Sequence, residues 1–411
     1  EMHTIQRGEI LVTPMTDPDW LPAMRQAAGI ITDRGGRTCH AAIVSRELAI
    51  PALVGTHNAT AELTNGQRIT LDCSQGEKGY VYQDFVPFET QVISYNELPQ
   101  APVDIMINLA DPDKAFLASF LPIKGVGLAR IEFIINNSIK IHPMALIHED
   151  DVIDENERQK IRHITAHYSD TTTFFINTLA RGIGMIAASM YPRPVFVRFS
   201  DFKTNEYRHL IGGQFFEPHE ENPMIGFRGA SRYYHEKYRQ AFALECAALT
   251  MVRTVFGLTN THLMVPFVRT ATEAAHVTQE LAANGLVRGA DGLKFIMMCE
   301  IPSNIIAMQS FCEYFDGFSI GSNDLTQLIL GVDRDSEIVS HIFDERDPAV
   351  LLMIKMALST AHMNNRTIGI CGQAPSDYPE FARFLIDHNI DSISLNSDAV
   401  IPFLAKIANT L

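Results

Sequence analysis

Short apolar runs recur from residue 104 to the C-terminus, and segments with helical periodicity separate most of them. Near-continuous apolar strands that alternate with helices are typical of a parallel sheet covered on both faces. The pattern predicts strands at 105–110, 125–131, 194–200, 262–268, 294–300, 318–322, 367–372 and 392–396. It predicts helices at 237–257, 271–285, 303–313, 347–362 and 378–387.

The number and the ends of these strands favour a closed (β/α)₈ barrel, of the TIM-barrel type, spanning residues 104–411. An open doubly wound sheet is the alternative. The barrel is preferred because polar or charged residues recur at the C-terminal ends of the strands, where barrel enzymes keep their chemistry. The stretch 201–261 would then be an insertion between the third and fourth strands.

Residues 1–84 predict a separate small α/β domain. Its expected strands are 8–14, 28–33, 51–55, 68–73 and 80–82, and a helix is expected from Thr38 to about Leu48. Residues 85–103 contain three prolines and show little periodicity, so they are interpreted as a partly helical linker. An ordinary segment lying along the surface between two domains is the alternative.

Composition narrows the classes of partner. The 411 residues carry a net charge of −15, which argues against nucleic acid or an anionic membrane as the main partner. Any phosphate site must therefore be built from local arginines. The six cysteines form no C-x-x-C pair, which speaks against zinc and thioredoxin-type sites and suits a reducing cytoplasm. No signal peptide or membrane-spanning run is evident, and because residue 1 is not Met we expect a fragment of a longer protein.

The stretch from Asp33 to Val44 is the first candidate for chemistry. Two glycines allow a tight turn, after which Thr38 can cap a helix that holds His40 in its first turn, and Arg37 adds a positive charge. A helix start favours an anion, so His40 could accept and pass on a phosphoryl group. The alternative is a capped helix whose histidine simply packs against the domain.

The ends of the predicted barrel strands are the second candidate. They bring Arg130, Arg198, Glu300, Asp324 and Cys371, and the string from Ser200 to Glu206 follows Arg198. Charged groups rarely end buried strands without a partner, and a divalent metal with a phosphorylated ligand would supply one. Each residue also has a simpler interpretation: a structural arginine–glutamate ion pair, a helix cap at Asp324, or a small core side chain at Cys371.

Longer stretches of the sequence support both candidate sites. Residues 35–55 resemble the phosphohistidine domain of the PEP-utilising enzymes, a family that includes the phosphoenolpyruvate synthases, the pyruvate phosphate dikinases and enzyme I of the sugar phosphotransferase system. The strings at 125–135, 197–207, 221–233, 264–270, 319–335 and 370–377 look like the barrel of the same family. Within it, TCHAAI, SDFKTNEY and CGQAPSD are most similar to the synthase branch.

The resemblance implies a role for each matching residue. By resemblance, His40 in a swivelling domain becomes phosphorylated, and Arg130, Arg198 and Arg228 clamp the phosphoryl group. Arg334 matches a further phosphate-binding arginine of the family. Glu300 and Asp324 would hold Mg²⁺, and Gly321, Ser322 and Asn323 would line the substrate. Cys371 would move the proton at the methyl carbon of pyruvate. A thiol is plausible there because its pKa can be tuned towards neutrality.

The resemblance also implies a reaction. In the synthase branch, ATP, pyruvate and water give phosphoenolpyruvate, AMP and phosphate through a phosphohistidine. Nothing here resembles the ATP-grasp domain expected upstream, so this chain should retain only the pyruvate half of the reaction, and family members are commonly dimers. The rivals are a phosphorelay component that passes phosphate from phosphoenolpyruvate to a partner protein, as in enzyme I, and a catalytically silent barrel used for assembly.

Overall fold

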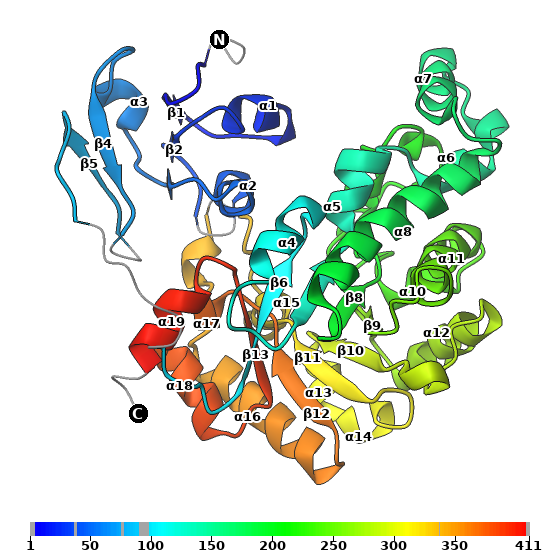
Figure 1. Cartoon of the computed structure of the whole chain (residues 1–411). Helices are drawn as coiled ribbons and strands as arrows, with labels where there is room; N and C mark the ends of the chain where they lie inside the picture. The colour runs from blue at the N-terminus through cyan, green and yellow to red at the C-terminus, as the bar shows by residue number, and fades with distance from the viewer. Residues whose placement is uncertain (1–4, 37–38, 75–77, 90–97, 337, 408–411) are drawn as a thin grey trace. The chain divides into compact units, whose positions relative to one another are not determined.

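The computed structural model of the chain describes residues 5–36, 39–74, 78–89, 98–336 and 338–407 (Figure 1). The chain divides into two compact units, one formed by residues 1–98 with 331–344 and the other by 99–330 with 345–411. The domain boundaries expected at residues 84 and 103 stay predictions.

The first unit is built on a three-stranded parallel sheet in the order β1-β2-β3. Later in the sequence, β4 and β5 form a separate two-stranded antiparallel sheet. The strands are β1 (Ile10–Thr13), β2 (Gly29–Thr32), β3 (Ala52–Leu53), β4 (Ile69–Asp72) and β5 (Tyr80–Gln83). The helices are η1 (Pro18–Trp20), α1 (Leu21–Met24), α2 (His40–Leu48), α3 (Ala59–Glu62) and, in the later segment, η8 (Ser340–Ile342). The five strands and the helix predicted here are confirmed.

Helix α2 begins later than expected. Its first residue is His40, and Cys39 occupies the N-cap position with an extended backbone. Thr38 and Arg37, the predicted cap and the predicted positive charge, lie outside the described residues. The middle of the predicted linker, residues 90–97, also lies outside them, and its described flanks at 85–89 and 98–103 contain no helix.

The second unit is a closed barrel of eight strands in which every neighbouring pair is parallel. The strands are β6 (Asp104–Leu109), β7 (Val126–Arg130), β8 (Val195–Arg198), β9 (Thr261–Val265), β10 (Phe295–Cys299), β11 (Gly317–Ile320), β12 (Thr367–Ile370) and β13 (Ser392–Leu395). Strand β13 pairs with β6 and closes the ring, so the predicted barrel is confirmed and the open sheet is not.

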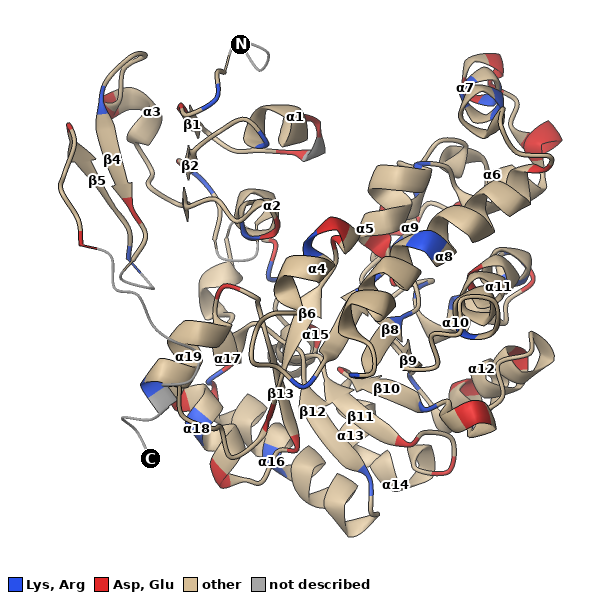
Figure 2. Ribbon diagram, in the orientation of Figure 1, with Lys and Arg blue, Asp and Glu red and all other residues tan. Residues whose placement is uncertain are grey.

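Helices surround the barrel, and Figure 2 shows that the strands themselves are mostly free of charged residues. The longer helices are α7 (Glu155–Thr165), α8 (Thr171–Met190), α11 (Arg239–Thr254), α12 (Ala271–Ala283), α15 (Ser322–Leu330), α16 (Pro348–Met363), α18 (Pro379–Asp387) and α19 (Val400–Ile407). The shorter ones are η3 (Pro112–Lys114), α4 (Ala115–Ala118), α5 (Glu132–Ile134), the π-helix η4 (Ile135–Ile139), α6 (Pro143–Ile147), η5 (Glu149–Asp151), α9 (Thr204–Arg208), η6 (Gly213–Phe215), α10 (Ala230–Tyr233), η7 (Ala290–Gly292), α13 (Pro302–Ile306), α14 (Met308–Phe311) and α17 (Ala374–Asp377).

Two features differ from the sequence prediction. Helices α7 and α8 were not among the predicted helices, and in α8 the threonines and glycines give weak helical propensity. Packing against α11 and the cap at Asp170, which accepts hydrogen bonds from the next turn, stabilise α8 instead. The predicted insertion at 201–261 contains α11 itself, a helix of the barrel layer, so only its first part departs from the regular alternation.

Candidate active site

Most of the predicted barrel residues lie at the C-terminal ends of the strands. Arg130 and Arg198 are the last residues of β7 and β8 and are paired in register. Glu300 follows β10, Gly321 follows its neighbour β11, and Cys371 follows β12. Because all strands run in parallel, these residues surround one mouth of the barrel, where enzymes of this architecture place their reactive groups.

Three buried carboxylates meet at this mouth. Asp201, Glu300 and Asp324 each offer an oxygen, and these oxygens all lie within 4.8 Å of one another. Glu300 is 1% exposed, and one of its oxygens accepts a hydrogen bond of 2.7 Å from the backbone of Phe267. Such a set of oxygen donors is what a hard divalent cation binds. Glu300 and Asp324 were predicted as metal ligands, whereas Asp201 had been assigned no role.

Gly321 gives Glu300 its room. A Cβ atom at residue 321 would lie 2.8 Å from Oε2 of Glu300, closer than a side chain tolerates. The absence of a side chain at the end of β11 therefore lets the carboxylate of the adjacent strand turn into the mouth. Helix α15 begins immediately afterwards with Ser322, Asn323 and Asp324 in its first turn.

Arg228 reaches the mouth from the segment between β8 and α11. Its guanidinium donates to both oxygens of Asp201, at 3.0 and 2.6 Å, and to Oδ2 of Asp324 at 2.9 Å. The same guanidinium lies 4.1 Å from the ring centre of Phe267. Gly229, with a φ of 59°, turns the chain tightly against Phe267 and so fixes the entry of Arg228.

Arg198 is held by a second carboxylate partner. Its Nη2 lies 2.7 Å from Oε1 of Glu132, the first residue of α5, and its Nη1 lies 3.5 Å from Oδ2 of Asp201. Burial by itself lowers the pKa of Arg198, but Glu132 and Asp201 outweigh it and raise that pKa above its ordinary value. The guanidinium is therefore a permanent positive charge in the mouth.

The carboxylate of Glu300, by contrast, is destabilised in its charged form. Burial and the neighbouring charges of Asp324 and Asp201 raise the pKa of Glu300 above its ordinary value, although Arg228 and Arg198 offset part of the effect. Carboxylates that repel one another in a buried site are stabilised by a bound cation, which reverses the local pKa shift. The donor set thus suits a divalent cation on electrostatic as well as geometric grounds.

Several buried polar atoms at the mouth have no hydrogen-bond partner among the described residues. They are Nε of Arg130, Oε2 of Glu132, Nε of Arg198, Oγ of Ser322 and Oδ1 of Asn323. Unsatisfied buried polar atoms cost free energy, so folded proteins contain few of them unless a ligand, ion or water completes the set. Their concentration here indicates a polar ligand.

Cys371 stands at the boundary between this polar mouth and an apolar interior. Its side chain packs with Leu128, Met264 and Met298, and its thiol donates to the carbonyl oxygen of Ile320 at 3.6 Å. Burial raises the pKa of the Cys371 thiol to about 11, although Ser319 and Arg198 pull it down. This shift is opposite in direction to a tuning towards neutrality, and a thiol of this pKa holds its proton at neutral pH.

A second buried network supports the segment that holds Asp201 and Arg228. The backbone N–H and the hydroxyl of Ser200 donate to the two oxygens of Glu245, at 3.1 and 2.5 Å. Farther along, Arg232 donates to both oxygens of Glu217, at 2.5 and 2.7 Å, and His142 lies 2.9 Å from the same carboxylate. These contacts fix both ends of the segment without entering the mouth.

His40 belongs to the first unit and is half-buried there. Its Nδ1 lies 3.0 Å from the hydroxyl oxygen of Thr16. Desolvation lowers the pKa of His40, while Asp17 partly opposes it, so the environment favours the neutral imidazole. In the tautomer whose Nδ1–H donates to the hydroxyl of Thr16, Nε2 is the nitrogen with a free lone pair.

Comparison with known protein families assigns both units. Residues 5–76 match the PEP-utilising enzyme, mobile domain, and residues 90–411 match the PEP-utilising enzyme, PEP-binding domain. This chain belongs to the PEP-utilising enzyme family.

Curated relatives point to one branch of the PEP-utilising family. The chain is 52% identical to phosphoenolpyruvate synthase of Neisseria meningitidis over 411 residues, covering 100% of this chain and 52% of that protein. It is 51% identical to phosphoenolpyruvate synthase of Escherichia coli over 408 residues, covering 99% of this chain and 51% of that protein. The chain therefore spans about half the length of the curated relatives that it matches.

Among solved structures, the chain is similar to a HpcH/HpaI aldolase/citrate lyase family protein from Burkholderia cenocepacia, with 14% identity and a TM-score of 0.41 over 75% of this chain and 93% of that one. The barrel assignment rests on the strand pairing described above. Within the described part of the chain, no helix is both long and apolar enough to cross a membrane.

The structure also places Arg334, Glu132 and Asp201 of this PEP-utilising enzyme. Arg334 lies in the segment 331–344, which belongs to the first unit, and its role in binding phosphate stays a prediction. Sequence reasoning assigned no role to Glu132 or Asp201. Each follows a strand that ends in an arginine, by two and three residues respectively, and that position was the signal that could have identified them.

Proposed function

We propose that this chain performs the pyruvate half of the phosphoenolpyruvate synthase reaction, in which His40 exchanges a phosphoryl group with pyruvate bound at the barrel mouth. The observation that supports it most is that Arg198 and Arg228 form ion pairs with the carboxylate cluster of Asp201, Glu300 and Asp324. A phosphorylated three-carbon acid needs both positive charge and a metal site.

The arginines would bind the phosphoryl group. Arg198 and Arg228 are held by carboxylates and stay charged, and Arg130 ends the strand beside Arg198 with a buried Nε that lacks a partner among the described residues. Preorganised guanidinium groups stabilise the charge that spreads over the oxygens of a transferring phosphoryl group. This arrangement requires buried ion pairs, whose desolvation costs free energy.

Glu300 and Asp324 would hold Mg²⁺, with Asp201 near enough to join them. When bound, the ion would neutralise the carboxylate and enolate oxygens of the substrate. The first turn of α15 would line the substrate through Gly321, Ser322 and Asn323, whose unpartnered Oγ and Oδ1 atoms supply polar contacts.

The chemistry divides into two steps. When phosphoenolpyruvate reacts, the bond between phosphorus and the oxygen on carbon 2 breaks, its electron pair stays on that oxygen, and a new bond joins phosphorus to Nε2 of His40. The resulting enolate then takes the thiol proton of Cys371 at carbon 3, which gives pyruvate and a thiolate that regains its proton from water. A thiol with a pKa of about 11 starts in the protonated form that this direction requires.

The complete reaction would belong to a longer protein. There, ATP would phosphorylate His40 in a region outside this chain, and AMP, phosphate and phosphoenolpyruvate would be the products. The match of residues 5–76 to a domain described as mobile supports a histidine that travels between two sites. A cytoplasmic homodimer is the expected setting of this enzyme.

The test is a single-turnover experiment with the chain itself. Mixed with excess phosphoenolpyruvate and Mg²⁺, it should release one pyruvate for each chain, and His40→Ala should release none. The absence of pyruvate from the unchanged chain would refute the proposal. The full-length protein distinguishes the synthase function from the rival phosphorelay function, because it should form AMP from ATP only if it is a synthase.

A further inference from the structure

Glu132 lies at the barrel mouth, where its carboxylate contacts two protein groups, Arg198 and the backbone of Asp201. Its Oε1 accepts a hydrogen bond of 2.7 Å from Nη2 of Arg198 and another of 2.8 Å from the backbone N–H of Asp201. One carboxylate oxygen therefore joins an arginine at the end of β8 to the residue that anchors Arg228. The side chain is only 14% exposed, so water can replace little of this contact.

The other restraints on Arg198 are weaker. Its Nη1 lies 3.5 Å from Asp201 and donates to the sulfur of Met298 at 3.6 Å, and its Nε has no partner among the described residues. Arginine has large rotamer freedom, which a short charge-assisted hydrogen bond removes most effectively. The direction of the guanidinium thus depends chiefly on Glu132.

We propose, on the basis of the function proposed above, that Glu132 is a positioning residue that aims Arg198 at the phosphoryl group. A carboxylate would repel a phosphoryl group, so Glu132 serves the transfer only through the arginine that it orients. Its contact with the backbone of Asp201 ties the same carboxylate to the support of Arg228. No hydrogen bond joins Glu132 to Cys371 among the described residues, so the loss of Glu132 should affect the phosphoryl-transfer step more than the proton step at Cys371.

The two steps can be measured separately on this chain. Pyruvate release from phosphoenolpyruvate in a single turnover requires phosphoryl transfer. Exchange of the methyl protons of pyruvate with deuterated water, in the presence of Mg²⁺, requires only enolisation. Glu132→Ala should slow pyruvate release by about 10- to 100-fold, the usual effect of losing a residue that orients an active-site group, and should slow exchange far less. Glu132→Gln keeps an oxygen for both donors but lacks the charge, so its rate should fall between those of the alanine variant and the unchanged chain.

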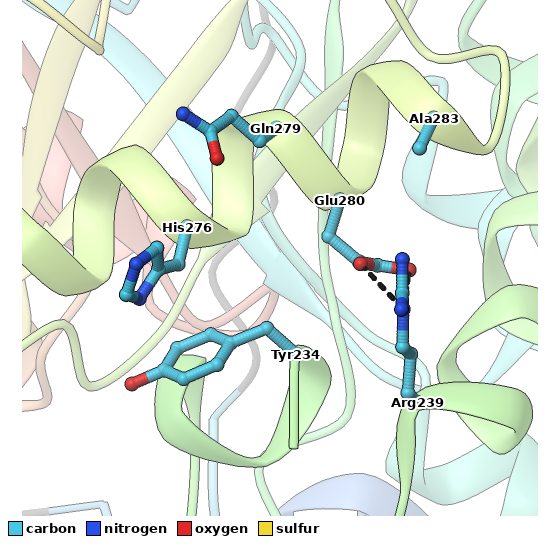
Figure 3. Close-up of a pocket in the computed structure, with 6 residues that line it drawn as sticks. All are labelled: Tyr234, Arg239, His276, Gln279, Glu280 and Ala283. Carbon is cyan, nitrogen blue, oxygen red and sulfur yellow. Dashed lines mark hydrogen bonds and ion pairs between the residues drawn. The ribbon is translucent and has the colours of Figure 1, made fainter. Parts of the chain in front are cut away.

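A matched control lies elsewhere on the barrel. Nε of Arg239 lies 2.8 Å from Glu280 at a surface pocket of about 350 Å³ between α12 and the start of α11, which contains no predicted site residue (Figure 3). Glu280→Gln weakens an arginine–glutamate pair at this pocket and should change neither rate.

The outcomes separate the hypotheses. Loss of both steps in Glu132→Ala and Glu132→Gln, with a lower melting temperature, would show a structural role and overturn the inference. Unchanged pyruvate release in both variants would overturn it as well. A failure of the unchanged chain to release pyruvate would instead refute the proposed function itself.

Discussion

Nη2 of Arg228 lies 2.9 Å from Oδ2 of Asp324, so an arginine expected to hold a phosphoryl group is hydrogen-bonded to a carboxylate expected to hold a metal ion. The two residues are 96 positions apart in the sequence. A cation bound by Asp324 would compete with this guanidinium for the same carboxylate. The predicted metal site and the predicted phosphoryl clamp would therefore be coupled through this contact.

The metal site gives the first prediction. Glu300→Gln and Asp324→Asn should each weaken divalent-cation binding by at least about tenfold, because each removes a charged oxygen ligand from a buried set. Titration with Mn²⁺, followed by electron paramagnetic resonance, measures this without any substrate. Asp387→Asn, which alters an exposed carboxylate on α18, is the control. Equal affinity in all three variants would contradict a site shared by Glu300 and Asp324.

The second prediction concerns Cys371. Cys371→Ala should still transfer a phosphoryl group from phosphoenolpyruvate to His40 in a single turnover, because a neutral thiol contributes no charge to the clamp. It should fail to exchange the methyl protons of pyruvate with deuterated water, which proton NMR follows directly. If Cys371 were only a core side chain, the folded variant would lose about 1–2 kcal/mol of stability and keep normal exchange.

The third prediction concerns Glu245, which is buried beneath the segment that holds Asp201. Burial raises the pKa of Glu245 from 4.5 to about 7, although hydrogen bonds from Ser200 and Tyr238 oppose the shift. Between these two values the folded protein keeps a proton that the unfolded chain releases, so the free energy of unfolding should fall as pH rises. The fall should be about 3 kcal/mol across the window, at about 1.4 kcal/mol per pH unit.

Urea unfolding at pH 5 and pH 7.5 measures this effect. Glu245→Gln cannot titrate, so it should lack this part of the pH dependence, and the unchanged chain should lose stability relative to it as pH rises. Parallel pH dependence of the two proteins would show that the Glu245 carboxyl does not keep its proton in the folded state.

The sequence predicted the barrel well because its signal is local. Strand β10 reads Phe-Ile-Met-Met-Cys and β12 reads Thr-Ile-Gly-Ile, and runs of this kind are typical of strands in a sheet buried on both faces. The residues that end or follow the strands, such as Arg198 and Glu300, were found for the same reason. Their position in the chain determines their place at the mouth.

The remaining features depend on contacts between distant segments. Helix α8 is stabilised by α11, which its own residues do not reveal. The hydrogen bond between Glu132 and Arg198 joins residues 66 positions apart. The pairing of β7 with β8 brings the two residues together, and the sequence alone does not show that pairing. The pKa of Cys371 moved opposite to the expectation because its neighbours are Leu128, Met264 and Met298, and a sequence motif does not show how far they bury the thiol.

The central claim is that His40 carries the phosphoryl group, and one measurement tests it most directly. The chain is incubated with phosphoenolpyruvate and Mg²⁺, digested under alkaline conditions that preserve phosphohistidine, and its peptides are mapped by tandem mass spectrometry. The account predicts one acid-labile phosphate, on His40, that is absent from His40→Ala and disappears when excess pyruvate is added. Phosphate on any other residue, or phosphate on His40 that pyruvate does not remove, would contradict it.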